Sequence, residues 1–248
     1  MKKNVLLLTA SLFLWTLLPV RVSCETAEEI LEKMIAAQGG RSALEKIRDT
    51  TLKGTMEMVQ MGLGGLLTTY QKEPNMLRMD ATVQGTVITQ AFDGQTAWMT
   101  NPITGMAEKM PDLMARDFGR SALGNDALLD PEKYGISYSL EGKETVEGKV
   151  YFALKQIFSD GFKATLLIDP ETFLMYKSKT TSINEIGEEL EVDTVFSDYR
   201  TIEGITLAHS FITYQDGREF MKMSISDVTF NSGLNDSLFK MEEKRPLP

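Results

Sequence analysis

Residues 49–58 read DTTLKGTMEM, and the alternation in this stretch decides the class of the fold. Apolar or small residues alternate with polar ones along it, in the order Leu52, Lys53, Gly54, Thr55, Met56, Glu57 and Met58. Side chains with a period of two point to opposite faces of a β-strand. The stretch therefore predicts a strand with one apolar face and one polar face.

The same alternation returns along most of the chain that follows. Turn residues such as Pro74-Asn75, Asp93-Gly94 and Asp216-Gly217 separate the alternating segments. We expect further strands near residues 66–73, 76–83, 86–92, 95–100, 106–110, 135–140, 143–147, 149–158, 162–168, 173–182, 189–198, 205–214 and 218–230. Short strands at this spacing predict a mainly β, α+β fold, in which a curved antiparallel meander is closed, or nearly closed, into a barrel.

Three segments depart from this period and predict helices. Residues 26–38 show helical spacing of apolar side chains and open with a capping box. A second capping box, Ser42 with Glu45, predicts a short helix through residue 47. Residues 111–129 follow an irregular helical pattern and predict one or two short helices. Because an apolar sheet face must be covered, we expect these N-terminal and mid-chain helices to form a lid.

The composition excludes several classes of function. The chain has 248 residues and a net charge of −9, which opposes nucleic-acid binding because that affinity comes from clustered cations. The single Cys and the single His rule out an internal disulfide and a multi-His or Cys/His metal site. We therefore expect no nucleic-acid partner, no metal and no cofactor.

Residues 1–24 have the order of a secretory signal peptide: two lysines, an apolar run and small residues at the exit. The apolar run, residues 5–20, is shorter than the ~20 residues that span a bilayer. We expect export to the periplasm and a single mature domain over residues 25–248. Cys24 has two interpretations: the residue just before an ordinary cleavage, or the lipid-bearing first residue of an outer-membrane lipoprotein. Arg21 stands where the lipoprotein pattern has an aliphatic residue, and this favours the first.

Methionine is frequent in the first half of the chain, since most of the 15 Met residues lie between positions 56 and 114. Met adapts to varied apolar shapes, but it also fills ordinary cores, and both interpretations stay open here. An incomplete barrel capped by helices leaves a concave apolar interior of the kind that binds hydrophobic ligands. From strand alternation we predict these ligand-binding residues: Met56, Met58, Met79, Trp98, Met99, Leu166, Phe196 and Phe211.

The segment MGLGGLL at residues 61–67 is apolar and rich in glycine, which predicts a hairpin tip. Exposed apolar loops often touch a membrane or a protein partner. Leu63, Leu66 and Leu67 are the candidate residues for peripheral membrane contact or for contact with an envelope protein. The alternative is a tip that folds back over the barrel mouth.

The lone histidine, His209, lies in a predicted strand, where alternation places it on the same side as Leu207 and Phe211. A hydrolase that uses His209 and a nearby serine is one candidate function, but no G-x-S-x-G elbow occurs in the chain. Because a catalytic site requires a constellation of groups, we predict a hydrogen-bonded structural imidazole and no catalytic residues.

Six segments of this sequence together resemble the outer-membrane lipoprotein-sorting (LolA/LolB-like) superfamily. They are residues 30–44 (ILEKMIAAQGGRSAL), 92–102 (FDGQTAWMTNP), 141–148 (EGKETVEG), 168–174 (IDPETFL), 196–211 (FSDYRTIEGITLAHSF) and 234–241 (LNDSLFKM). Each combines a turn with a strand edge. The sequence departs from the family at Ala208, where many members have Pro, and no position matches the cavity arginine of the carriers.

The resemblance implies a half-open antiparallel barrel with a helical lid, a hydrophobic cavity between them and a periplasmic location. It also implies non-enzymatic carriage of lipid or of lipoprotein acyl chains. We therefore expect an exported protein that binds a lipid or an acylated lipoprotein by burying the acyl chain. The alternatives are an envelope interaction module that docks a protein partner without ligand, and the hydrolase that uses His209.

The mature N-terminus tests the interpretation of the leader. We expect intact-mass spectrometry of the exported protein to show a chain without residues 1–24 and without lipid, because the residues before Cys24 fit ordinary cleavage better. A diacylglyceryl group on Cys24 would contradict this expectation and would make the protein an outer-membrane lipoprotein.

Overall fold

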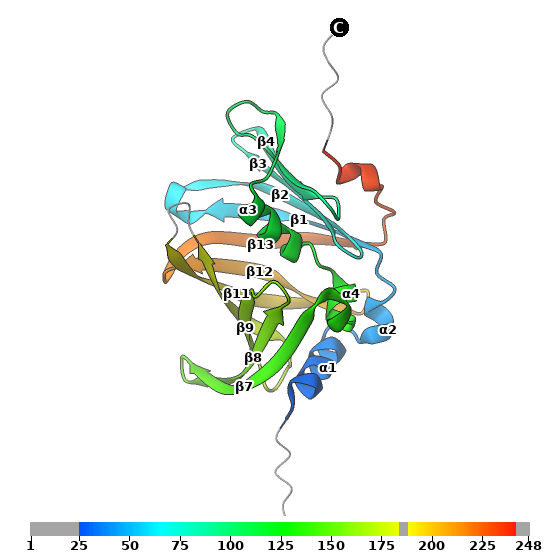
Figure 1. Cartoon of the computed structure of the whole chain (residues 1–248), viewed down its shortest axis with the longest axis vertical. Helices are drawn as coiled ribbons and strands as arrows, with labels where there is room; N and C mark the ends of the chain where they lie inside the picture. Colours follow the sequence, from blue (N-terminus) through cyan, green and yellow to red (C-terminus); the bar gives the residue numbers. More distant parts are fainter. Residues whose placement is uncertain (1–24, 184–187, 242–248) are drawn as a thin grey trace, which may run out of the picture.

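The computed structural model describes residues 25–183 and 188–241. The predicted signal peptide at residues 1–24, with Cys24, lies outside the described residues. Within the described ranges, thirteen β-strands form one curved antiparallel sheet, with helices α1, α3 and α4 on one side of it (Figure 1). The sheet is not closed, since β6 and β7 are its two edges, and this confirms the half-open barrel that the family resemblance implies.

The strands follow the turn signals of the sequence. Those before the mid-chain helices are β1 (Asp49–Met58), β2 (Leu63–Lys72), β3 (Met76–Val83), β4 (Thr86–Phe92), β5 (Ala97–Thr100) and β6 (Ala107–Lys109). Those after the helices are β7 (Ile136–Val146), β8 (Lys149–Phe158), β9 (Lys163–Ile168), β10 (Met175–Ile183), β11 (Glu189–Ile202), β12 (Ile205–Gln215) and β13 (Arg218–Phe230). The two strands expected at 135–140 and 143–147 are the single strand β7, which has a bulge between Leu140 and Gly142.

The helices are short. They are α1 (Ala27–Ala37), α2 (Arg41–Leu44), α3 (Asp112–Ser121) and α4 (Asn125–Leu129), with 3-10 turns η1 (Val59–Met61), η2 (Glu132–Tyr134) and η3 (Asp236–Leu238). The capping box of Thr26 and Glu29 forms at the start of α1 as predicted. The second box is wrong, because α2 begins at Arg41 and its N-cap is Gly40, with φ of 86°. A positive φ suits glycine, so Gly40 turns the chain between the two helices without a side-chain cap.

The strand order explains why the sheet stays open. It runs β6-β5-β4-β3-β2-β1-β13-β12-β11-β10-β9-β8-β7. The first and last strands of the chain pair in the middle, so β6 and β7, which follow one another in sequence, form the two edges. The segment that joins these edges carries α3 and α4 across the open side of the sheet (Figure 1). The mid-chain helices are therefore part of the lid that the sequence predicts.

Strand register assigns side chains to the two faces, because residues that pair directly in antiparallel strands share a face. One row across β1, β13, β12 and β11 consists of Met56, Met223, Phe211 and Phe196. The next row on the same face includes Met58, Met221, Thr213, Thr194, Ser178 and Leu166. We call the face that carries these rows the inner face, and the opposite one the outer face.

The helices pack on the inner face. In α1, Ile30 and Met34 are buried in a cluster with Leu154 and Leu166 of the sheet. Helix α3 crosses the inner face over the N-terminal strands, where a Cβ added to Gly119 would lie 3.5 Å from Phe92 Cζ. The lid thus covers two regions of the inner face: α1 packs over β7–β9, and α3 packs over β4 and β5.

The chain reaches α2 through a close contact between glycine and the sheet. The backbone N–H of Thr206, at the start of β12, donates to the Gln38 carbonyl at 3.1 Å. Gly39 follows Gln38, and a Cβ at Gly39 would lie 2.5 Å from the carbonyl oxygen of Gly204. Glycine at position 39, with φ of 124°, therefore lets the end of α1 pack directly against the β11–β12 turn.

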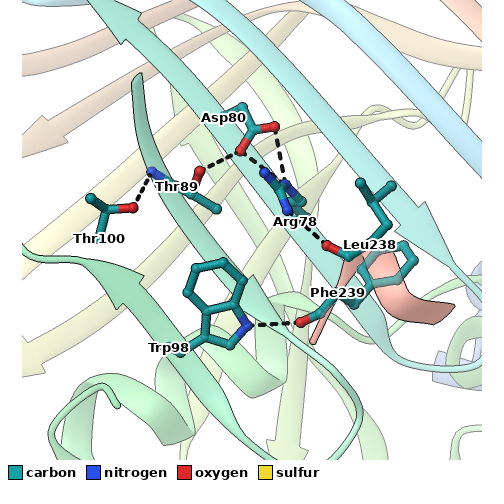
Figure 2. A network of polar contacts seen from close by, with 7 residues as sticks. All are labelled: Arg78, Asp80, Thr89, Trp98, Thr100, Leu238 and Phe239. Carbon is teal, nitrogen blue, oxygen red and sulfur yellow. Dashed lines mark hydrogen bonds and ion pairs between the residues drawn. The ribbon is translucent and has the colours of Figure 1, made fainter. Parts of the chain in front are cut away.

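Residues 231–239, which we call the C-terminal strap, cross the outer face of the N-terminal strands. The side chains of Lys72, Arg78 and Trp98 donate to the carbonyls of Leu234 at 2.6 Å, Leu238 at 2.8 Å and Phe239 at 2.8 Å. Figure 2 shows the contacts of Arg78 and Trp98, together with the Asp80 carboxylate that accepts from Arg78 and Thr89. The Phe239 side chain is fully buried, so the strap adds core on the outer face.

The prediction that Trp98 lines the barrel interior is wrong. Trp98 pairs with Ala91, and Ala91 pairs with Arg78, so all three lie on the outer face. The neighbouring row of Met99, Gln90 and Met79 lies on the inner face. The face of a strand as short as β5 depends on its register with β4, and alternation alone does not give that register.

Asp49 joins the beginning of β1 to the C-terminal strap. Its carboxylate, 3% exposed, accepts from the backbone N–H groups of Ser232 at 2.7 Å, Gly233 at 3.0 Å and Leu234 at 3.2 Å, and from the Ser232 hydroxyl at 2.9 Å. Burial acts to raise the pKa of Asp49, but these hydrogen bonds outweigh burial and hold the pKa below its ordinary value. The ionised carboxylate therefore stabilises the junction of the two chain ends.

We expect Asp49→Asn to lower the free energy of unfolding by about 2 kcal/mol, because the amide turns a donor toward donors that the carboxylate accepted from. Urea denaturation at neutral pH measures the loss. The contribution of Asp49 is present above the ordinary carboxyl pKa of 3.8 and is lost as the pH falls through the lower folded pKa. The difference between the two proteins should therefore shrink on acidification. Asp227→Asn, at an exposed position of β13, is the control, and an equal loss there would contradict the assignment.

Candidate functional site

A cavity of about 800 Å³ lies between the helical lid and the inner face of β7–β12. Helix α1 contributes Met34 and Gln38 to its wall, and α4 contributes Ala127 and Leu128. Helix α3 and the turn behind it contribute Asp117, Arg120, Ser121, Leu123 and Gly124. A volume of this size is typical of sites that bind small ligands.

The wall of the cavity is mainly apolar. Leu166, Phe196 and Phe211, three of the residues predicted to bind ligand, line it. The rings of Phe196 and Phe211 meet edge to face with their centroids 5.5 Å apart. Other apolar side chains of the lining are Ile136, Phe158, Phe162, Leu174, Met175, Val192 and Leu207. Such a surface favours the burial of hydrocarbon.

The predicted methionines lie on the correct face but not in this cavity. Met56, Met58, Met79 and Met99 are on the inner face of the N-terminal strands and are partly buried. None of them lines the 800 Å³ cavity, which faces β7–β12. Sequence alternation found the face, but it could not tell which half of the sheet the lid leaves open.

The glycine-rich segment is mostly strand rather than loop. The tip consists of η1 and Gly62, and β2 already begins at Leu63. Leu66 is 64% exposed, whereas Leu67 is 3% exposed, since neighbours in a strand point to opposite faces. Leu67 is buried and does not form part of an exposed contact surface, so that part of the prediction is wrong. Leu63 is partly buried, and Leu66 stays a candidate contact residue together with Met61, which is 63% exposed.

His209 is buried beside the cavity without lining it. Its ring Nδ1 lies 3.1 Å from the Leu207 carbonyl oxygen, and its exposed fraction is 2%. Leu207 and Phe211 line the cavity, and so does Ala208. The register of β11 with β12 continues without a shift on both sides of His209, from Ser197–Ser210 to Tyr199–Ala208. The placement of His209 on the side of Leu207 and Phe211 therefore stays a prediction.

Arg120 connects the lid to the C-terminal strands. Its guanidinium forms ion pairs with Asp117 of α3 and with Asp160 of the β8–β9 turn. The guanidinium carbon also lies 4.2 Å from the centroid of the Phe162 ring, within the range of a cation–π contact. Sequence reasoning missed Arg120, because only the fold brings α3 next to the β8–β9 turn.

The hydroxyl groups of two tyrosines in the cavity wall form hydrogen bonds with other groups of the protein. Gln156 Nε2 donates to the Tyr138 hydroxyl at 2.8 Å, and the Tyr199 hydroxyl donates to the Met175 carbonyl at 2.6 Å. Burial raises the pKa of Tyr199 to about 12 and also raises the pKa of Tyr138. Both phenols are therefore neutral at physiological pH and serve to hold the wall in place.

Glu73, just after β2, anchors α4 over the cavity. Its carboxylate accepts from the backbone N–H groups of Asn125 at 2.8 Å and Asp126 at 3.2 Å, at the start of the helix. Burial raises the pKa of Glu73, although these two hydrogen bonds oppose the rise. A Cβ at Gly124 would collide with the carboxylate, so the contact requires glycine there. At the other end of α4, Arg41 donates to the Leu129 carbonyl at 2.8 Å.

Residues 25–183 and 188–241 contain no group of three or more His, Cys, Asp or Glu side chains placed to hold a metal ion. The helices in these ranges are too short or too polar to cross a membrane.

No protein-family model matches the sequence, and no curated protein matches it. Solved structures do share the fold. A domain described as an outer membrane lipoprotein-sorting protein, from Vibrio parahaemolyticus, is similar at a TM-score of 0.58 and 17% identity, covering 86% of this chain and 97% of that one. A DUF1329 family protein from Desulfovibrio piger gives a TM-score of 0.59 at 17% identity, covering 86% and 97%.

A LolA superfamily protein from Nitrosomonas europaea is similar at a TM-score of 0.58 and 16% identity, covering 87% of this chain and 98% of that one. The likeness therefore extends over nearly the whole of each solved chain. It shows that this protein has the LolA-like fold, which confirms the fold that the resemblance in sequence implied.

We expect Glu73→Ala to loosen α4, because the mutation removes the acceptor for two N-terminal amides of the helix. Hydrogen exchange of the amides of residues 125–129 should accelerate about tenfold, the equivalent of about 1.4 kcal/mol of local stability. Glu57→Ala, at an exposed position of β1, is the control. Unchanged exchange in α4 would show that Glu73 does not anchor the lid.

Proposed function

We propose that this protein is an exported, non-enzymatic binding protein that carries a lipid or the acyl chain of a lipoprotein. The observation that carries the proposal is the apolar cavity of about 800 Å³ under the helical lid. Burial of hydrocarbon in such a site contributes ~0.8 kcal/mol per CH₂ group before ordering costs. A ligand with one or two acyl chains therefore binds mainly through its chains.

The arrangement of the lid supports carriage. Helix α1 packs on the sheet through buried apolar side chains, whereas α3 has no buried side chain and α4 has one, Ala127. Polar contacts, such as those of Arg120 with Asp160 and of Glu73 with α4, hold these two helices. Contacts of this kind release individually at a modest cost, so α3 and α4 can move for ligand exchange while the continuous sheet stays folded.

The comparisons support the proposal through the fold. One of the similar structures is described as a lipoprotein-sorting domain and another as a LolA superfamily protein. Export to the periplasm rests on the pattern of residues 1–24. The exposed side chains of Met61 and Leu66 offer a contact with the membrane or the envelope protein that supplies the ligand.

The position of His209 supports a binding protein over the hydrolase. Its Nδ1 lies within hydrogen-bonding distance of a backbone carbonyl, and the residue does not line the cavity. A general base must reach the proton that it abstracts from a bound substrate. His209→Ala should accordingly leave ligand binding unchanged wherever the variant folds.

Ligand binding is tested on protein purified from an exporting host. Native mass spectrometry should show co-purifying lipid, and a neutral naphthylamine dye should bind the delipidated protein with enhanced fluorescence. The double variant Phe196→Ala, Phe211→Ala should weaken dye binding about tenfold, because it removes apolar contact from the cavity wall. Met79→Ala is the matched control, since Met79 lies on the inner face outside the cavity. Protein that carries no lipid and ignores the dye would overturn the proposal.

A further inference from the structure

The charge of the cavity wall restricts the ligand that it can hold. Among the described residues that line the cavity, Asp117 and Arg120 are the only charged ones. The Arg120 guanidinium pairs with Asp117 and also with Asp160, so two carboxylates surround one cation. Phe162 covers a face of the same guanidinium at 4.2 Å. The cluster as a whole carries an excess negative charge and offers no unpaired cation.

Such a wall disfavours an anionic headgroup. A phosphate or carboxylate that enters the cavity gives up its hydration and needs a positive partner in return. Arg120 can become that partner only by releasing Asp117 or Asp160, and its side chain is only 16% exposed. The free-energy cost of burying an unpaired charge therefore weakens the binding of anionic ligands.

A group of uncharged polar side chains lines the cavity toward the end of the sheet where β12 turns into β13. The row with Phe196 and Phe211 contributes only apolar side chains to the cavity. The next row contributes Ser178, and the row after that contributes Thr180 and Gln215, which all line the cavity. Across these three rows the wall becomes more polar, while Gln38 and Thr206 line the cavity at its other end.

These side chains have hydrogen-bonding capacity to spare. The Thr180 hydroxyl donates to the Val192 carbonyl at 3.2 Å and keeps its capacity to accept. Within the described part of the chain, the side chains of Ser178 and Gln215 form no hydrogen bond. A hydroxyl and an amide can both donate and accept, so this end of the cavity matches a headgroup rich in hydroxyl or ester groups.

Resting on the function proposed above, we propose that the cavity selects a lipid with an uncharged headgroup over one with an anionic headgroup. The acyl chain lies against Leu166, Phe196 and Phe211. The hydroxyl or ester groups of the headgroup meet Ser178, Thr180 and Gln215. Arg120, held by its two carboxylates, ties down the lid and does not bind the ligand.

The test uses two lipids that differ only in one phosphate. Displacement of the neutral naphthylamine dye from delipidated protein compares 1-myristoylglycerol with 1-myristoyl lysophosphatidate at neutral pH. We expect the glycerol ester to displace the dye at a concentration about tenfold lower, because the phosphate has no unpaired cation to meet. Tetradecyltrimethylammonium, with a chain of the same length, tests whether the excess negative charge instead attracts a cation.

Two sets of variants identify the groups responsible. Asp160→Asn leaves Arg120 with one carboxylate and should improve the binding of lysophosphatidate about fivefold relative to that of the glycerol ester. If Asp160→Asn folds poorly, Asp117→Asn repeats the test, because it removes the other carboxylate that pairs with Arg120. Asp227→Asn is the control. Ser178→Val with Gln215→Leu should weaken binding of the glycerol ester about fivefold relative to binding of the dye.

The outcomes separate this inference from the proposed function. If lysophosphatidate or the ammonium compound bound at least as tightly as the glycerol ester, the selection for an uncharged headgroup would be overturned. The proposed carriage of lipid would not be affected by that result. Failure of the dye and of every lipid to bind would overturn the proposed function itself. Aspartate variants with unchanged selectivity would show that the Arg120 pairs do not set it.

Discussion

The rest of the structure depends on the pairing of the first strand with the last. β1 and β13 meet in the middle of the sheet, and every other strand extends outward from this pair to one of the two edges. Asp49 fixes the junction, because its buried carboxylate accepts four hydrogen bonds from the C-terminal strap. Without this pairing, the strands before and after the mid-chain helices would form two separate sheets, and α3, which packs against β5, would no longer be held over the cavity of β7–β12.

The same topology forces the sheet to remain open. Strands that are joined through α3 and α4 stand at opposite edges, so the connection must pass over the inner face. The part of the lid formed by α3 and α4 is therefore a consequence of chain order, and polar contacts help to hold these two helices in place. Glu73 and Arg120 supply such contacts at two corners. A sheet that curves around helices of this size leaves space where α1, α3 and α4 do not meet.

The charges around the cavity, like its apolar wall, favour an uncharged ligand. The full chain is acidic, with a net charge of −9, and Arg120, the only cation among the described residues of the cavity wall, pairs with two carboxylates. Selection by such a cavity comes from what it excludes as much as from what it holds. Hydrocarbon gains by burial at the aromatic end, whereas a charged headgroup loses hydration without finding a partner.

The sequence by itself determined the antiparallel strands, the helices and their order, because alternation, turn residues and caps are local signals. It also identified the inner-face positions of Met56, Met79 and Phe211. Only the tertiary structure decided that Trp98 lies under the C-terminal strap and that Arg120 meets Asp160. It likewise decided that the cavity faces β7–β12 rather than the methionine-rich strands. The physical reason is that register between strands and contact between distant segments depend on packing, and no local pattern encodes packing.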